Sequence, residues 1–146
     1  MNGTGPVATS VFDVTASALS AERLRLTVIA QNIANAQSAA KTADGTPYRR
    51  QKVVFESVLK ESKGRDGDGL PVGAVRARLA TDSSPFQRVK KPGDPDADQD
   101  GWVTLPNVNV IDEMVDLIDA SRTYEANLSA LRTYHQMLQQ TIEMAK

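Results

Sequence analysis

The amino-acid sequence predicts an α+β fold: a long antiparallel hairpin of N- and C-terminal helices, forming a coiled-coil stem, with a small, mostly β insertion between the helices. Apolar residues recur at seven-residue intervals near both ends of the 146-residue chain. Between these regions, proline, glycine and short β-type runs become frequent. We therefore expect one discontinuous helical stem domain, residues 1–43 and 108–146, and a β-rich insertion with loops, residues 44–107.

The N-terminal helix is expected over residues 10–36. Ser10 and Asp13 have the spacing of a capping box, which marks a helix start. The apolar face of this helix carries Phe12, Leu19, Leu26, Ile29 and Ile33. Such a helix is marginal alone, because most helical stability comes from packing its apolar face.

The middle of the chain is expected to hold short strands at residues 52–55, 75–79 and 102–105. Its charge is unevenly distributed, since residues 44–91 are rich in Lys and Arg and residues 94–100 contain four Asp. These charges are either solvated faces or complementary contacts between neighbouring copies.

The C-terminal helix has the longest stripe, and no proline or glycine follows Pro106. Asn109 is its predicted N-cap. The stripe has two interleaved rows, Val110, Leu117, Tyr124, Leu131, Leu138 and Ala145, and Met114, Ser121, Leu128, His135 and Ile142. Four apolar residues lie off the stripe and should stay partly exposed, a mark of an association surface: Ile111, Val115, Ile118 and Met137. We expect the two helices to pair within one chain, although an intermolecular coiled coil is the alternative.

Composition excludes several classes of function. The chain has no cysteine, which excludes disulfides, zinc-thiolate sites and thiol nucleophiles. A net charge of −1 argues against nucleic-acid binding. No apolar run approaches the roughly 20 residues of a membrane helix, and the first ten residues do not resemble a cleaved secretory signal. We expect no membrane insertion.

No motif for catalysis or cofactor binding is present. The single histidine, His135, lies on the helical stripe, where a role at a helix interface is favoured over that of a general base. No nucleophile elbow, metal-binding helix or phosphate loop accompanies the serines and carboxylates. We therefore expect no enzyme, no cofactor and no metal.

One loop resembles part of a calcium site. Asp96, Asp98, Asp100 and Gly101 match the first positions of an EF-hand loop, but Asn107 stands where a bidentate glutamate is needed. Prolines also deny the loop its flanking helices. We favour a solvated acidic turn whose aspartates bond local backbone amides, with a calcium-binding module as a remote alternative.

An ordered set of strings resembles the bacterial flagellar basal-body rod proteins, in particular the proximal-rod members. They are SALSAERLRL (17–26), QNIANA (31–36), PYRR (47–50), VVF (53–55), PGDPDAD (92–98), PNVNV (106–110), EMVD (113–116) and ASRTYEAN (120–127). The resemblance covers most of the chain. It implies a structural subunit that stacks helically into the proximal rod of the drive shaft.

The resemblance also implies partners and a location. The partners are other copies of the chain, other flagellar rod proteins including the rotor-ring junction protein and distal rod subunits, and the flagellar type III export apparatus. The location is the basal-body rod, which crosses the periplasm, after export from the cytoplasm without a cleaved signal peptide. A cytoplasmic coiled-coil adaptor or chaperone is the alternative reading of the same stripes.

Both terminal helices are expected to be partly disordered in the free subunit and to fold as they dock on neighbouring subunits. Asn32 and Asn35, near the end of the first helix, either cap it or bond between subunits. The predicted subunit or helix interface is Phe12, Leu19, Leu26, Ile29, Asn32, Ile33, Asn35, Met114, Leu117, Tyr124, Asn127, Leu128, Leu131, Leu138 and Ile142.

Overall fold

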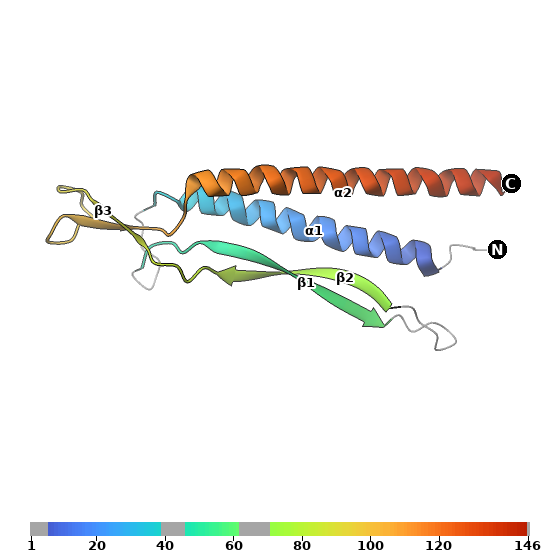
Figure 1. The fold of residues 1–146 in the computed structure, drawn as a ribbon, viewed down its shortest axis with the longest axis horizontal. Helices are drawn as coiled ribbons and strands as arrows, with labels where there is room; N and C mark the ends of the chain where they lie inside the picture. The colour runs from blue at the N-terminus through green and yellow to red at the C-terminus, as the bar shows by residue number, and fades with distance from the viewer. Residues whose placement is uncertain (1–5, 39–45, 62–70, 146) are drawn as a thin grey trace. The chain divides into compact units, whose positions relative to one another are not determined.

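The computed structural model describes residues 6–38, 46–61 and 71–145. Two long helices enclose four strands in the chain order (Figure 1). The elements are α1 (Pro6–Asn35), β1 (Gln51–Glu61), β2 (Pro71–Thr81), β3 (Gln87–Lys90), β4 (Trp102–Leu105) and α2 (Val110–Met144). The predicted α+β fold, with N- and C-terminal helices and β strands between them, is confirmed.

The start of α2 is as expected and the start of α1 is not. The Oδ1 atom of Asn109 accepts a hydrogen bond from the Ile111 amide at 3.1 Å, which confirms Asn109 as the N-cap. Helix α1 begins at Pro6, a residue type that suits the first helical position because its ring presets φ and its missing N–H is not needed there. The predicted capping box at Ser10 is therefore wrong.

The strands form two separate two-stranded sheets, β1 with β2 and β3 with β4. Strands β3 and β4 are antiparallel, with Lys90 opposite Trp102 and Val89 opposite Val103. All three predicted strands are present, and β1 and β2 are longer than expected. The sequence analysis missed β3, because Gln87–Lys90 is a short, mostly polar and exposed segment with no apolar pattern.

The chain divides into two compact units, each containing part of both helices. Unit 1 is Met1–Leu24, Phe55–Arg78 and Ala120–Lys146, and unit 2 is Arg25–Val54 and Leu79–Asp119. These limits do not coincide with the predicted boundaries of a helical stem and a β insertion. That division into domains stays a prediction.

In unit 1, aromatic rings join the two helices. The Phe12 ring lies edge-on to Tyr134, with 5.3 Å between centroids, and 6.4 Å from the ring of His135. Strand β2 meets α1 where the Val75 amide donates to Ser17 Oγ at 3.0 Å. Only Ala21, Glu22 and Ala120 are buried among the side chains that the structure describes in this unit.

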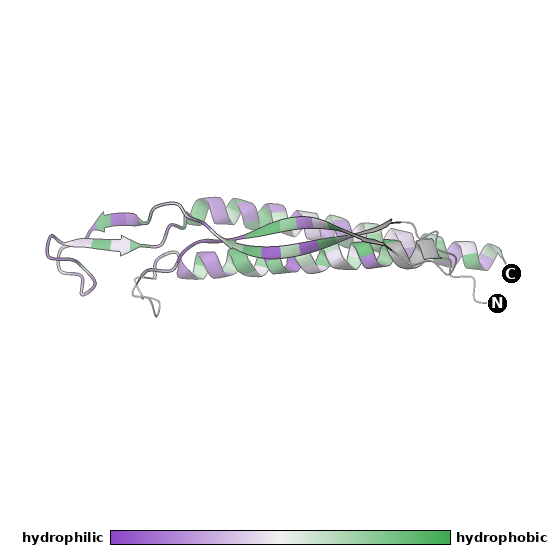
Figure 2. Ribbon diagram, turned by 90° about the horizontal axis from the view of Figure 1, so that it is seen from below, coloured by the Kyte–Doolittle hydropathy of each residue, from purple (hydrophilic) through white to green (hydrophobic). Residues whose placement is uncertain are grey.

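In unit 2, the helices run antiparallel. Arg25 lies 3.9 Å from Asp119, whereas Asn32, further along α1, bonds Glu113, which comes earlier in α2. Val28, Ile29, Val103 and Val108 are buried here. Hydrophobic and hydrophilic residues alternate along the helix ribbons, as Figure 2 shows. Neither helix, over its described residues, is long and apolar enough to cross a membrane.

Candidate functional site

Most residues of the predicted interface are buried or half-buried in the single chain. Ile29 and Asn32 are buried. Met114 and Ile142 are 54% and 57% exposed in the single chain, so other parts of this chain cover them little. The others are half-buried: Phe12, Leu19, Leu26, Ile33, Asn35, Leu117, Tyr124, Asn127, Leu128, Leu131 and Leu138. Their role between subunits stays a prediction.

The first turns of α2 carry a second apolar face that points to solvent. We call Ile111, Met114, Val115 and Ile118 the exposed stripe; their exposures are 72%, 54%, 62% and 55%. Their spacing of three, four and seven residues places them on one side of the helix. The expected exposure of Ile111, Val115, Ile118 and Met137 is confirmed. A contiguous apolar face of this kind marks an association surface.

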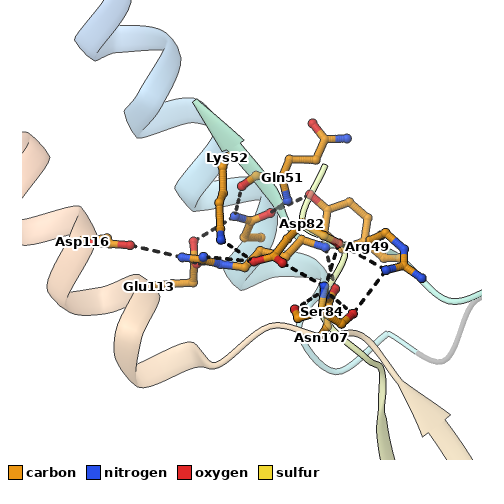
Figure 3. A network of polar contacts seen from close by, with 11 residues as sticks. Arg49, Gln51, Lys52, Asp82, Ser84, Asn107, Glu113 and Asp116 are labelled. Atoms are coloured by element: carbon orange, nitrogen blue, oxygen red, sulfur yellow. Dashed lines mark hydrogen bonds and ion pairs between the residues drawn. The ribbon is translucent and has the colours of Figure 1, made fainter. Parts of the chain in front are cut away.

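The same turns of α2 also carry a buried carboxylate. Glu113 is 1% exposed and belongs to a network that we call the polar junction (Figure 3). Its members come from the end of α1, the start of β1, the segment after β2, and the beginning of α2. They are Asn32, Tyr48, Arg49, Arg50, Gln51, Lys52, Asp82, Ser84, Asn107, Glu113 and Asp116.

Asn32 is the buried centre of the polar junction. Its Nδ2 donates to the Gln51 carbonyl at 2.8 Å and to Glu113 Oε2 at 2.9 Å. Its Oδ1 accepts from the Tyr48 hydroxyl at 2.8 Å and from the Gln51 amide at 3.0 Å. All four bonds that an asparagine side chain ordinarily forms are therefore made. Capping was one of two roles considered for Asn32, and its side chain instead bonds Tyr48, Gln51 and Glu113. Asn35 donates to a carbonyl of its own helix, that of Gln31, at 2.8 Å.

Arg50 joins three carboxylates. Its Nε donates to Glu113 Oε1 at 2.6 Å, and its Nη2 lies 3.2 Å from Asp116 Oδ2. Its Nη1 is 3.5 Å from Asp82 Oδ2. Burial opposes the charge of this guanidinium, but the hydrogen bonds and charge of Glu113 outweigh it and the pKa of Arg50 is raised.

Asp82 connects the end of β2 to the same cluster. Lys52 Nζ lies 2.6 Å from its Oδ2, and the Ser84 amide donates to its Oδ1 at 3.0 Å. The hydrogen bond from Lys52, followed by those from Ser84, holds the pKa of Asp82 well below its ordinary value. For Tyr48, burial and then the Glu113 carboxylate raise the pKa of the phenol.

Asn107 fixes the segment that leads into α2. Its Oδ1 accepts from the Arg50 amide at 2.8 Å, and its Nδ2 donates to Ser84 Oγ at 2.9 Å. The polar junction thereby ties α1, β1 and the segment after β2 to the start of α2. The groups within it satisfy one another, so its role is to set the orientation of the first turns of α2, which carry the exposed stripe.

The acidic loop has the structure that the sequence analysis favoured. Asp98 Oδ1 accepts from the Asp100 amide at 3.0 Å and from the Trp102 amide at 2.8 Å. The Trp102 amide, the Asp100 amide and the nearby Arg88 together lower the pKa of Asp98 although burial opposes this. Over residues 6–38, 46–61 and 71–145 no group of three His, Asp or Glu is placed to hold a metal ion.

The sequence analysis did not identify the polar junction. Glu113 entered it only through the string EMVD, and it did not single out Arg50 or Asp82. The available signal was the set of strings that carried the resemblance. QNIANA, PYRR, PNVNV and EMVD lie far apart in sequence, yet they contribute Asn32, Arg50, Asn107 and Glu113 to one network.

Two family models of flagellar rod proteins match the chain, one in its N-terminal part and one in its C-terminal part. The family described as "Flagella basal body rod protein" matches residues 12–38, and the family described as "Flagellar basal body rod FlgEFG protein C-terminal" matches residues 99–144. These ranges contain α1 from Phe12 onward and all of α2.

Whole-chain relatives are similar over nearly the full length. The chain is 41% identical to the flagellar basal-body rod protein FlgC of Yersinia enterocolitica, covering 94% of this chain and 97% of that protein. It is 39% identical to FlgC of Salmonella typhimurium, with 94% and 97% covered. It is 38% identical to FlgC of Bacillus subtilis, with 92% and 96% covered. This chain therefore belongs to the FlgC family of flagellar basal-body rod proteins.

Proposed function

We propose that this chain is a structural subunit of the proximal rod in the bacterial flagellar basal body, and that it has no enzymatic activity. It polymerises through its terminal helices into the shaft that transmits motor torque. Membership of the FlgC family supports the location. The observation that carries the assembly mechanism is the exposed stripe of α2, where four large apolar side chains are each more than half exposed in the single chain.

The proposed partners follow from this location. They are further copies of the chain, the rotor-ring junction protein at one end of the proximal rod, and distal rod subunits at the other. Before assembly the subunit passes the flagellar type III export apparatus, without a cleaved signal peptide. The chain has no cysteine, so no disulfide hinders passage of an unfolded chain.

Assembly also orders those parts of the helices that are partly disordered in the free subunit. Among the described side chains of unit 1 no large apolar residue is buried, and Phe12, Leu128 and Leu131 are half-buried. Such a region has little hydrophobic stabilisation to offset its conformational entropy. The unit 1 parts of both helices are therefore partly disordered in the free subunit and become ordered between neighbours, where close packing resists twist.

The experiment that tests assembly introduces a charge into the exposed stripe. Val115→Asp and Ile118→Asp should each abolish incorporation into purified basal bodies and motility. Because both side chains point to solvent, neither change should lower the stability of the free chain. Gln99→Asp, an exposed loop position given the same added charge, is the matched control and should leave motility intact.

Two results would contradict the proposal. A motile strain carrying Val115→Asp would exclude the exposed stripe as an assembly surface, and a discrete stable dimer in size-exclusion chromatography would favour a coiled-coil adaptor. Leu128→Asp and Leu131→Asp should also block assembly. These two residues are half-buried, so damage to the subunit itself would contribute to their effect.

A further inference from the structure

The outward face of the β3–β4 hairpin carries a tryptophan and two basic side chains. Cross-strand partners point to the same side of a sheet, so Arg88 and Lys90 share a face with Thr104 and Trp102. The opposite face carries Val103, which is 1% exposed and packs inward. We call Arg88, Lys90, Trp102 and Thr104 the outer hairpin face.

Trp102 is the apolar centre of this face. It is the only tryptophan in the chain and is 37% exposed. The Arg88 guanidinium carbon lies 5.6 Å from the Trp102 ring centroid, and the same side chain forms an ion pair with Asp98 at 2.8 Å. Lys90 is exposed and forms no ion pair within the described part of the chain. An exposed tryptophan beside cations is typical of residues that dominate binding energy in protein interfaces.

The exposed stripe of α2 has the opposite charge. Residues 110–119 contain four acidic residues and neither Lys nor Arg. Asp112 and Asp119 each directly follow a stripe residue and are seven positions apart, so they lie along one flank of the stripe. Glu113 and Asp116 are engaged by Arg50, which leaves Asp112 as the carboxylate available beside Ile111.

We propose that the outer hairpin face of one copy docks on the exposed stripe of the next copy. This proposal rests on the proposed function, and it names the surface that the exposed stripe binds. Trp102 packs among Met114, Val115 and Ile118. The Met114 sulfur is suited to contact with the aromatic ring of Trp102. Lys90 pairs with Asp112. The occupant is a second copy because this chain carries both members of a charge-complementary pair of surfaces.

This contact is heterologous, since it joins two different surfaces of unit 2. A heterologous contact does not close on itself into a two-fold dimer, and repetition generates a ring or a helical filament. That property agrees with a subunit that is added in succession along a rod.

Intermolecular complementation tests the contact. Lys90→Glu and Asp112→Lys, each expressed alone in a strain without the wild-type chain, should lower incorporation into basal bodies by roughly tenfold or more, because each places like charges together. Co-expression of the two variants should restore incorporation, since the altered hairpin of one copy meets the altered helix of the other. A chain carrying both Lys90→Glu and Gln99→Lys, co-expressed with Lys90→Glu as a control, should not restore it, because the added positive charge lies at an exposed loop position outside the contact.

A second measurement does not depend on charge reversal. Because the native chain has no cysteine, a short bismaleimide should cross-link basal bodies that contain a mixture of Lys90→Cys and Asp112→Cys chains into dimers. Neither variant alone should cross-link. A dimer from a single variant, or no dimer from the mixture, would overturn the docking mode.

The outcomes separate this inference from the proposed function. If co-expression fails to restore incorporation while Val115→Asp still blocks it, the exposed stripe assembles with another surface and the docking inference is wrong. If Val115→Asp incorporates normally, the exposed stripe is not an assembly surface, and the assembly mechanism in the proposed function fails together with the docking inference.

Discussion

Replacing Asn32 by alanine tests the structural importance of the polar junction. The change removes four hydrogen bonds from a side chain that is 1% exposed. Three involve neutral partners, at about 1 kcal/mol each, and the bond to the Glu113 carboxylate contributes about 2 kcal/mol. Allowing for partial relaxation, Asn32→Ala should lower the free energy of unfolding of unit 2 by about 3 to 5 kcal/mol.

The assay is equilibrium urea unfolding of the purified chain, followed by the fluorescence of Trp102. This residue is the only tryptophan and lies in unit 2, so its signal reports on the unit that contains the polar junction. Asn35→Ala is the matched control from the same helix. It loses one exposed bond to the Gln31 carbonyl and should cost less than about 0.5 kcal/mol.

Asn32→Asp separates the shape of the side chain from its hydrogen bonding. The aspartate keeps the size and the acceptors, but it loses both donated bonds and places a carboxylate beside Glu113. It should therefore destabilise at neutral pH at least as much as alanine does. A loss below about 1 kcal/mol for Asn32→Ala, or one equal to that of Asn35→Ala, would refute the argument that this amide holds unit 2 together.

Three further predictions use the same unfolding assay. Arg50→Met leaves Glu113 buried without its cation and should lower the free energy of unfolding by about 3 to 5 kcal/mol. A decrease under about 1 kcal/mol would exclude Arg50 as the essential partner of Glu113. Because the pKa of Asp82 is depressed below 3.8 in the folded chain, its stabilisation is present above that pH and lost as the pH falls through the folded value. Asp82→Asn should accordingly weaken the chain at neutral pH and flatten the acid decline; an unchanged acid slope would contradict this. Gly101 has φ of +78°, and an added Cβ would lie 3.4 Å from Pro92. Gly101→Ala should therefore lower the free energy of unfolding by about 1 to 2 kcal/mol. An unchanged free energy of unfolding would show that the turn adapts.

The helices were predictable because their signal is local and periodic. The seven-residue row beginning at Val110 is half-buried through Leu138, as expected. The row from Met114 to Ile142 is exposed at both ends, since a straight α-helix drifts by about 20° per heptad relative to a seven-residue repeat. Periodicity therefore identified the helices correctly, but it did not show which residues of each row are covered within the single chain.

The polar junction could not be predicted from pattern. Its members are single polar residues from four segments, and no spacing rule relates Asn32 to Glu113. Arg50 and Asp82 occur in a region rich in charges, where composition does not distinguish a structural ion pair from a solvated one. The resemblance to known rod proteins grouped most of these segments, but only the three-dimensional arrangement showed that they meet.

The wide separation of the junction partners imposes an order on folding. Asn32 and Glu113 are 81 positions apart, and Arg50 bonds a residue 63 positions further along. When the N-terminal end of the polypeptide appears first, this cluster cannot be completed until Glu113 has also appeared. Closing so long a loop is slow. The far end of α1 therefore waits for the beginning of α2, and a fragment ending before residue 113 should leave Asn32 hydrated and its helix unanchored.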